Sequence, residues 1–470
     1  MAAYWYTILM KINMLLDETR KYLLSAFFPI TIGVLAFLCW ILPGNRVYFP
    51  AVFYALCCFL PLFSKEGKCY LPLYLFHIVL PDSPLLLKGI PGEVLLTGIS
   101  LILSSILFLI LRKPKLQKGE LFYPLLILIS VLLVSYLYNM VKDGSNDFRG
   151  ILYILALYGL LLLSIFFFTT LGNEESLPYF SSTVSVLDVI IVSEIIVSLF
   201  YDNSVTPLIW STFRLGWAMN GTTASTLLAL SLPFLSMNIA KKRYQSLVIF
   251  LYAVLGILLI SSYSGLIALL FSIVPLIFLS FRTYGNKYPY LVLTFLVITG
   301  SVLILLIGFN KTANANILNA LKSLNPLADI PEGRLPFYQE SIEQFIKNPV
   351  LGVSIARRTL SNGSISFSGN SLLTSMIFGG VFGLLAFLFL EFHVYFISMK
   401  KKTPDRLLFL IFLIIQEVIG YLDDTLYLMP VFVFYLLAVT IYQVSNRPQD
   451  TIVHQDFFEN YTPGENLDLR

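Results

Sequence analysis

The chain alternates long apolar runs with short polar connections, and this pattern predicts a bundle of helices. A helix that crosses a membrane needs about 20 predominantly apolar residues. Such runs predict spans at 22–42, 47–63, 70–87, 94–111, 120–141, 150–171, 184–201, 221–240, 246–262, 265–281, 288–309, 371–398, 406–420 and 428–444. The third span is interrupted by Pro72, Pro81, Asp82 and Pro84.

Composition supports a membrane protein. Of 470 residues, 57% are hydrophobic and 12% charged, whereas an average soluble domain has about 25% charged residues. The mean hydropathy is +0.81. We therefore expect one all-α polytopic membrane domain over 1–470, in contact with membrane lipids. A net charge of +4 spread over short loops argues against a nucleic-acid partner.

Lys and Arg collect on the cytoplasmic side of membrane proteins. The densest clusters, at 112–118, 241–243, 282–287 and 400–406, are separated by even numbers of predicted spans. The basic residues of the N-terminal segment join that side only if 70–87 crosses the membrane. This parity predicts about 14 transmembrane helices, with both termini and the tail 445–470 in the cytoplasm.

The longest outward-facing segment on this topology is 310–370, which becomes a large periplasmic loop. Within it, apolar residues recur at helical spacing. They are Leu335, Tyr338, Ile342, Phe345 and Ile346. The spacing predicts an amphipathic helix on the outer membrane surface, ended by the Asn348-Pro349 pair.

Arginines on the outward side are candidate ligands for phosphate, because a guanidinium stays charged and offers a fork of donors. Arg214 lies between small residues just before a span, and Arg334 immediately precedes the amphipathic helix. The alternatives are an interfacial anchor for Arg214 and a structural ion pair for Arg334. The adjacent Arg357 and Arg358 also fit plain contacts with lipid headgroups.

Carboxylates supply the candidate bases. Asp423 and Asp424 fall in the outward turn between the last two spans, and Glu340 falls on the amphipathic helix. Adjacent like charges favour a proton acceptor, although a solvated turn explains the two aspartates equally well. Asp188 and Glu194 lie inside one span but about 120° apart on the helix, which favours packing hydrogen bonds. The histidines and cysteines have no metal-ligand spacing, so we expect neither metal nor cofactor.

Three segments together resemble the O-antigen ligase and polymerase superfamily of bacterial membrane glycosyltransferases. They are RLGWAMNGTTASTLLALSLPFL from Arg214, EGRLPFYQESIEQFIKNPVLGVS from Glu332 and GNSLLTSMIFGGVFGLLAFLFL from Gly369. Their order around one large outer loop is similar to that of the family. The ligases carry a histidine where this chain has Gly369, and an arginine in the turn where it has residues 262–265. The resemblance is therefore greatest to the Wzy-type O-antigen polymerases.

The resemblance implies a GT-C-like fold in the bacterial inner membrane, with an active site that faces the periplasm. It implies polymerisation of undecaprenyl diphosphate-linked oligosaccharide repeat units, which serve as donor and acceptor, and a chain-length regulator protein as a partner. The expected catalytic residues are Arg214, Arg334, Asp423, Asp424 and Glu340. The expected substrate-binding residues are Asn220, Arg357, Arg358, Tyr338, Asn370 and Tyr263. An O-antigen ligase, and a lipid-linked oligosaccharide flippase or transporter, are the alternatives.

Overall fold

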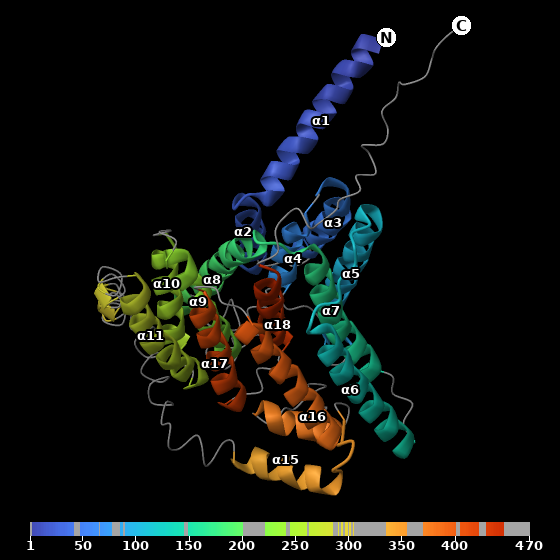
Figure 1. The fold of residues 1–470 in the computed structure, drawn as a ribbon, viewed down its shortest axis with the longest axis vertical. Coiled ribbons are helices and arrows are strands. Elements are labelled where there is room, and N and C mark those ends of the chain that lie inside the picture. Colours follow the sequence, from blue (N-terminus) through green and yellow to red (C-terminus); the bar gives the residue numbers. More distant parts are fainter. Residues whose placement is uncertain are drawn as a thin grey trace.

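The computed structural model describes residues 2–41, 48–64, 66–77, 85–87, 90–144, 149–200, 221–240, 245–260, 263–284, 335–354, 370–400, 405–422 and 429–445, with isolated positions between 290 and 304. In these ranges the fold is that of an all-α membrane protein, with one short two-stranded hairpin (Figure 1).

The first half of the described chain contains eight α-helices and the hairpin. The elements are α1 (Ala2–Leu24), α2 (Phe27–Ile41), α3 (Tyr48–Phe63), the 3₁₀ helix η2 (Gly67–Tyr70), α4 (Leu71–Phe76), β1 (Leu85–Leu87), β2 (Ile90–Pro91), α5 (Gly92–Arg112), α6 (Phe122–Lys142), α7 (Arg149–Leu171) and α8 (Ser176–Phe200).

The second half adds helices on both sides of the predicted periplasmic loop. They are α9 (Gly221–Ala240), α10 (Gln245–Ile260), α11 (Tyr263–Tyr284), α15 (Leu335–Lys347), α16 (Ser371–Lys400), α17 (Arg406–Leu422) and α18 (Met429–Val444). A helix therefore follows most of every predicted span except 70–87, where only the short α4 is helical, and 288–309, most of which is outside the described residues.

Among the described residues, three helical segments are long and apolar enough to cross a membrane on their own. They are Phe122–Lys142, Ser176–Val197 and Ser371–Lys400. A fourth is possible if Met14–Leu24 and Phe27–Leu38, which meet at 71°, form one bent span. The other apolar helices are shorter, such as Gln245–Ile260 and Val431–Val444. The predicted number of crossings thus stays a prediction.

The prediction of a continuous helix over 70–87 is wrong. Helix α4 ends at Phe76, and 85–87 form a strand that pairs with β2. The physical reason is in the sequence: Pro81 and Pro84 lack the backbone N–H that a helix needs and clash with the preceding turn.

Several polar contacts gather basic residues at one end of the molecule, which we call the basic end. Arg112 donates from Nη2 to the Ser64 carbonyl oxygen at 2.7 Å, and Lys400 Nζ lies 2.8 Å from Glu120 Oε1. Arg20 Nε donates to the Phe63 carbonyl oxygen at 3.3 Å. Basic residues from three distant parts of the sequence therefore share one end.

The described residues from Lys68 to His77 pack inside the bundle, although they do not form one helix. Lys68 is ion-paired to Glu175 beside the start of α8, and the next residues pack along α5. Tyr70 and Tyr74 each bond to a serine hydroxyl of α5 at 2.9 Å, and His77 lies against Gly98. Gly98 is about 21 Å along the helix from Arg112. The chain thus leads away from the basic end between Lys68 and His77.

Aromatic packing sets the direction of the central helices. Phe180 near the start of α8 contacts Phe234 of α9 with ring centroids 5.3 Å apart, and Phe234 contacts Phe412 of α17 at 5.2 Å. Ser181 of α8 also donates to the Phe234 carbonyl oxygen at 2.9 Å. Helix α8 thus leaves the basic end and α9 returns to it.

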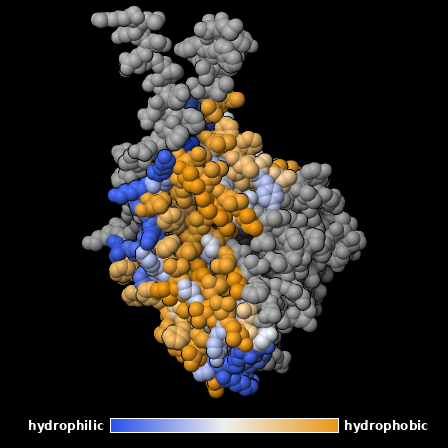
Figure 2. Space-filling model, turned by 90° about the vertical axis from the view of Figure 1, so that its right-hand side faces the viewer, coloured by the Kyte–Doolittle hydropathy of each residue, from blue (hydrophilic) through white to orange (hydrophobic). Residues whose placement is uncertain are grey.

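The outer surface is apolar over its middle. Figure 2 shows a broad hydrophobic area between hydrophilic residues at the lower end and along one upper edge. Large apolar side chains of α6 and α16 are exposed on the bundle, including Val134, Tyr138, Phe382 and Phe392. Contiguous exposed apolar surface of this kind is expected against lipid and not against water.

Candidate functional site

The predicted amphipathic helix is present as α15, and it lies at the pole opposite α1 (Figure 1). We call this pole the α15 end. Helix α15 contacts the bundle through Ser341, which is 1% exposed, with Tyr338 and Phe345 half-buried beside it. Ile342 and Ile346 on the same predicted apolar face are exposed. The protein thus covers only one edge of that face and leaves the other free for a membrane surface.

A turn after α15 docks into a break in α16. The Val381 N–H donates to the Pro349 carbonyl oxygen at 2.8 Å, and the Val353 N–H donates to the Ile377 carbonyl oxygen at 2.7 Å. Helix α16 is broken at Gly380, where φ is 63° and ψ is −148°. Two backbone hydrogen bonds therefore fix the end of the amphipathic helix to a broken helix of the bundle.

Glycine is required on both sides of this junction. Gly352 and Gly380 both have positive φ, a region that L side chains avoid. A Cβ at Gly352 would lie 2.1 Å from the Ile377 carbonyl oxygen, and one at Gly380 would lie 2.3 Å from the Val350 carbonyl oxygen. Both obstacles are backbone atoms, which cannot turn away as a side chain can.

Helix α6 holds the junction from the other side. Ser135 Oγ lies within hydrogen-bond distance of two carbonyl oxygens, that of Leu351 at 2.5 Å and that of Phe378 at 2.6 Å. Asn139 Nδ2 donates to the Gly352 carbonyl oxygen at 3.2 Å. These buried side chains satisfy carbonyl groups that the turn and the broken helix cannot pair within themselves.

Asn370 links the start of α16 to the end of α17. Its Oδ1 accepts hydrogen bonds from the N–H groups of Leu372 at 2.9 Å and Leu373 at 3.1 Å, as a helix N-cap does. Its Nδ2 donates to the Tyr421 carbonyl oxygen at 3.1 Å. The predicted substrate-binding asparagine therefore has a structural role beside the turn that contains Asp423.

Of the other predicted site residues, Glu340 and Tyr338 are described on α15. Glu340 is exposed and its Oε1 accepts a hydrogen bond from Gln344 Nε2 at 2.7 Å. Tyr263 is the first residue of α11, but its side chain is outside the described part. Seven more lie outside the described residues: Arg214, Asn220, Arg334, Arg357, Arg358, Asp423 and Asp424. Their roles stay predictions.

Comparison with known proteins identifies no family for this chain, because no family model and no curated protein matches its sequence.

One carboxyl group that the sequence reasoning did not single out lies inside the bundle. Glu391 of α16 is 6% exposed, and its Oε2 accepts a hydrogen bond from the Tyr435 hydroxyl of α18 at 2.7 Å. Glu417 of α17 is in hydrogen-bond contact with it. Two carboxyl groups in such contact need a proton between them. The sequence feature that could have identified this site is a single glutamate, Glu391, inside a long apolar run.

For the two acidic residues of α8, the predicted packing hydrogen bond is found among the described residues for Asp188 but not for Glu194. Asp188 is hydrogen-bonded to Ser231 of α9. Glu194 is fully buried, and neither of its oxygens has a hydrogen-bond partner among the described residues. No group of three or more His, Cys, Asp or Glu in the described part could hold a metal ion.

Proposed function

We propose that this protein is a membrane glycosyltransferase that joins polyprenyl diphosphate-linked oligosaccharide repeat units into a surface polysaccharide. The reaction would take place at the α15 end, facing the periplasm of a bacterial inner membrane. The observation that supports this most is the docking of the segment Pro349–Val353 into the break of α16. This docking holds α15 against α16. Helix α15 follows Arg334 directly in the sequence, and α16 is capped by Asn370.

The chemistry requires cations near a departing diphosphate. As the bond from the anomeric carbon to the diphosphate breaks, negative charge grows on the phosphate oxygens. Preorganised guanidinium groups stabilise that charge best where water is excluded. We assign this role to Arg214 and Arg334. Arg214 lies in the connection between α8, which leaves the basic end, and α9, which returns to it.

The acceptor hydroxyl must lose its proton as it attacks the anomeric carbon. A positioned carboxylate contributes about 10² to 10⁴ in rate by taking that proton. Glu340 is exposed on α15, and Asp423 follows the α17 end that Asn370 contacts. These two, with Asp424, are our candidates for the base. The apolar grooves between helices would hold the polyprenyl chains.

The test exchanges the two arginines and measures polysaccharide length. Arg214→Ala and Arg334→Ala should each abolish long-chain polymer, with a rate loss of about 10² to 10³ if each guanidinium supplies one donor set to the developing charge. Lysine in either position should rescue poorly because it lacks the fork geometry. Arg406→Ala, at the start of α17 on the basic side, is the matched control and should leave the polymer unchanged. Long polymer persisting in either alanine variant at normal protein level would refute the proposal.

A transporter or flippase is the second candidate. Transporters often contain broken helices and ionisable residues deep in the membrane, and α16 combines the break at Gly380 with the buried Glu391. Purified protein in vesicles with lipid-linked repeat units separates the two functions. Ladders of longer glycans indicate a polymerase, whereas translocation without ladders indicates a flippase. Addition of lipid A core as acceptor would identify a ligase.

A further inference from the structure

A cavity of about 840 Å³ lies at the basic end, away from the proposed reaction site. It is bounded by the junction of α1 and α2, by η2, by the first half of α8, and by the residues where α9 ends and α10 begins. This volume is in the range of cavities that bind small molecules. Two of the helices that line it, α1 and α2, meet at 71°.

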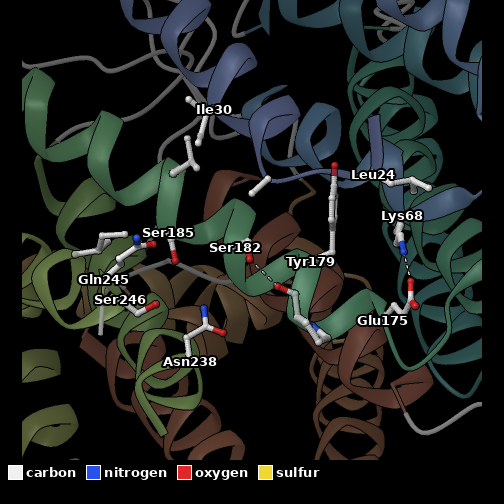
Figure 3. A pocket seen from close by; sticks show the side chains of 14 residues that line it. Leu24, Ile30, Lys68, Glu175, Tyr179, Ser182, Ser185, Asn238, Gln245 and Ser246 are labelled. Carbon is white, nitrogen blue, oxygen red and sulfur yellow. Dashed lines mark hydrogen bonds and ion pairs between the residues drawn. The ribbon is translucent and has the colours of Figure 1, made fainter. Parts of the chain in front are cut away.

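The cavity lining is divided by chemistry. Figure 3 shows Lys68 and Glu175 together at one end, and Asn238, Gln245 and Ser246 at the other. Ile30, Val186 and Ile249 add apolar walls. A ligand that fills this space therefore has a polar head and apolar chains.

At the end of the cavity lined by Asn238, Gln245 and Ser246, two buried polar side chains have no hydrogen-bond partner within the described part of the chain. They are Asn238, which is 3% exposed, and Ser246, which is 6% exposed. Figure 3 shows the Asn238 amide directed into the cavity. Buried amides and hydroxyls in proteins are nearly always hydrogen-bonded, so these groups are available to a ligand. Both can donate to phosphate oxygens.

The end of the cavity lined by Lys68 and Glu175 favours binding of a cation. Lys68 is ion-paired with Glu66 at 2.8 Å and also with Glu175, so two carboxylates surround one ammonium. Burial by itself lowers the pKa of Lys68, but the hydrogen bonds and charges of the two glutamates outweigh it and raise the pKa. The side chain of Glu175 is 47% exposed, and only its Oε2 is used by Lys68. Its other oxygen is left to accept a hydrogen bond.

We propose that this cavity binds a membrane phospholipid whose headgroup carries a primary ammonium. The ammonium donates to the free carboxylate oxygen of Glu175. The phosphate accepts hydrogen bonds from Asn238, Gln245 and Ser246, and the acyl chains lie along the apolar wall. The site is independent of the proposed glycosyltransferase reaction at the opposite end.

The test measures lipid binding to the purified full chain by native mass spectrometry. Phosphatidylethanolamine should bind at least tenfold more tightly than phosphatidylcholine, which has the same charges but no N–H donor, and than anionic phosphatidylglycerol. Equal binding of the three lipids, or no binding of any, would overturn the proposal.

Two variants locate the site. Glu175→Gln keeps a hydrogen-bonding oxygen near Lys68 but removes the charge, and should abolish the preference for phosphatidylethanolamine. Asn238→Leu should weaken binding of phosphatidylethanolamine several-fold. Glu174→Gln removes a charge from the exposed neighbour outside the cavity, and should bind like the wild type. If Glu175→Gln keeps the preference, or fails to fold while Asn238→Leu binds normally, the assignment is wrong.

Discussion

At the scale of single residues, Asn370 makes two kinds of contact that can be separated by substitution. Its carbonyl oxygen caps α16, and its amide nitrogen binds the backbone of α17. An aspartate keeps the capping oxygen but cannot donate to a carbonyl. An alanine loses both interactions.

We predict that Asn370→Ala lowers the free energy of unfolding by about 1 to 2 kcal/mol, because a helix cap and one further hydrogen bond are lost. Asn370→Asp should cost less in spite of its charge, since a carboxylate is a good N-cap. Thermal unfolding in detergent measures both. Equal losses for aspartate and alanine would show that the bond to Tyr421, which both variants lose, and not the cap, stabilises this end of α16.

At the scale of elements, the break in α16 decides where α15 lies. An unbroken helix would present no free carbonyl or N–H groups to a neighbouring chain. The break at Gly380 exposes both, and the Pro349 carbonyl oxygen and the Val353 N–H pair with them. The position of the amphipathic helix thus depends on two glycines more than on its own apolar face.

We predict that Gly352→Ala and Gly380→Ala each reduce stability by more than about 3 kcal/mol, since backbone strain and a backbone clash add together. Gly144→Ala is the matched control. Gly144 has a φ of 60°, but a methyl group added there would meet no atom of the described residues within 4 Å. This substitution should therefore cost only about 1 to 2 kcal/mol. Folded yield and thermal unfolding provide the measurement. Equal losses of stability in the three variants would contradict a backbone clash at Gly352 and Gly380.

At the scale of the whole molecule, a broad apolar area lies between hydrophilic residues at the lower end and along one upper edge of the face in Figure 2. The basic end collects Arg20, Arg112 and Lys400. The α15 end collects the amphipathic helix and the starts or ends of α6, α16 and α17. From the positive-inside rule we expect the basic end to face the cytoplasm.

This orientation predicts the labelling of single cysteines by a membrane-impermeant maleimide, with Cys39, Cys57, Cys58 and Cys69 first replaced by alanine. Lys347→Cys on α15 should react in intact spheroplasts. Lys115→Cys, in the exposed connection before α6, should react only after the membrane is opened. Labelling of both positions from the same side would contradict the topology.

Much of the helical framework is determined by the sequence alone. Apolar runs such as 120–141 and 406–420 correspond to α6 and α17 within two residues at each end. In the membrane interior a helix satisfies all its backbone groups within one segment, so hydropathy is enough to locate it. The bounds of α15 followed equally from local periodicity.

Tertiary structure alone decided which groups meet. Ser341, a polar residue in the middle of α15, is more buried than the isoleucine that follows it, because the turn after Lys347 fixes which side of the helix meets the bundle. Glu391 contacts Tyr435 and Glu417 on two other helices, and the spacing of these residues along the chain does not predict the contacts. Local patterns specify a helix because its hydrogen bonds are local, whereas a site depends on contacts between segments that are distant in the sequence.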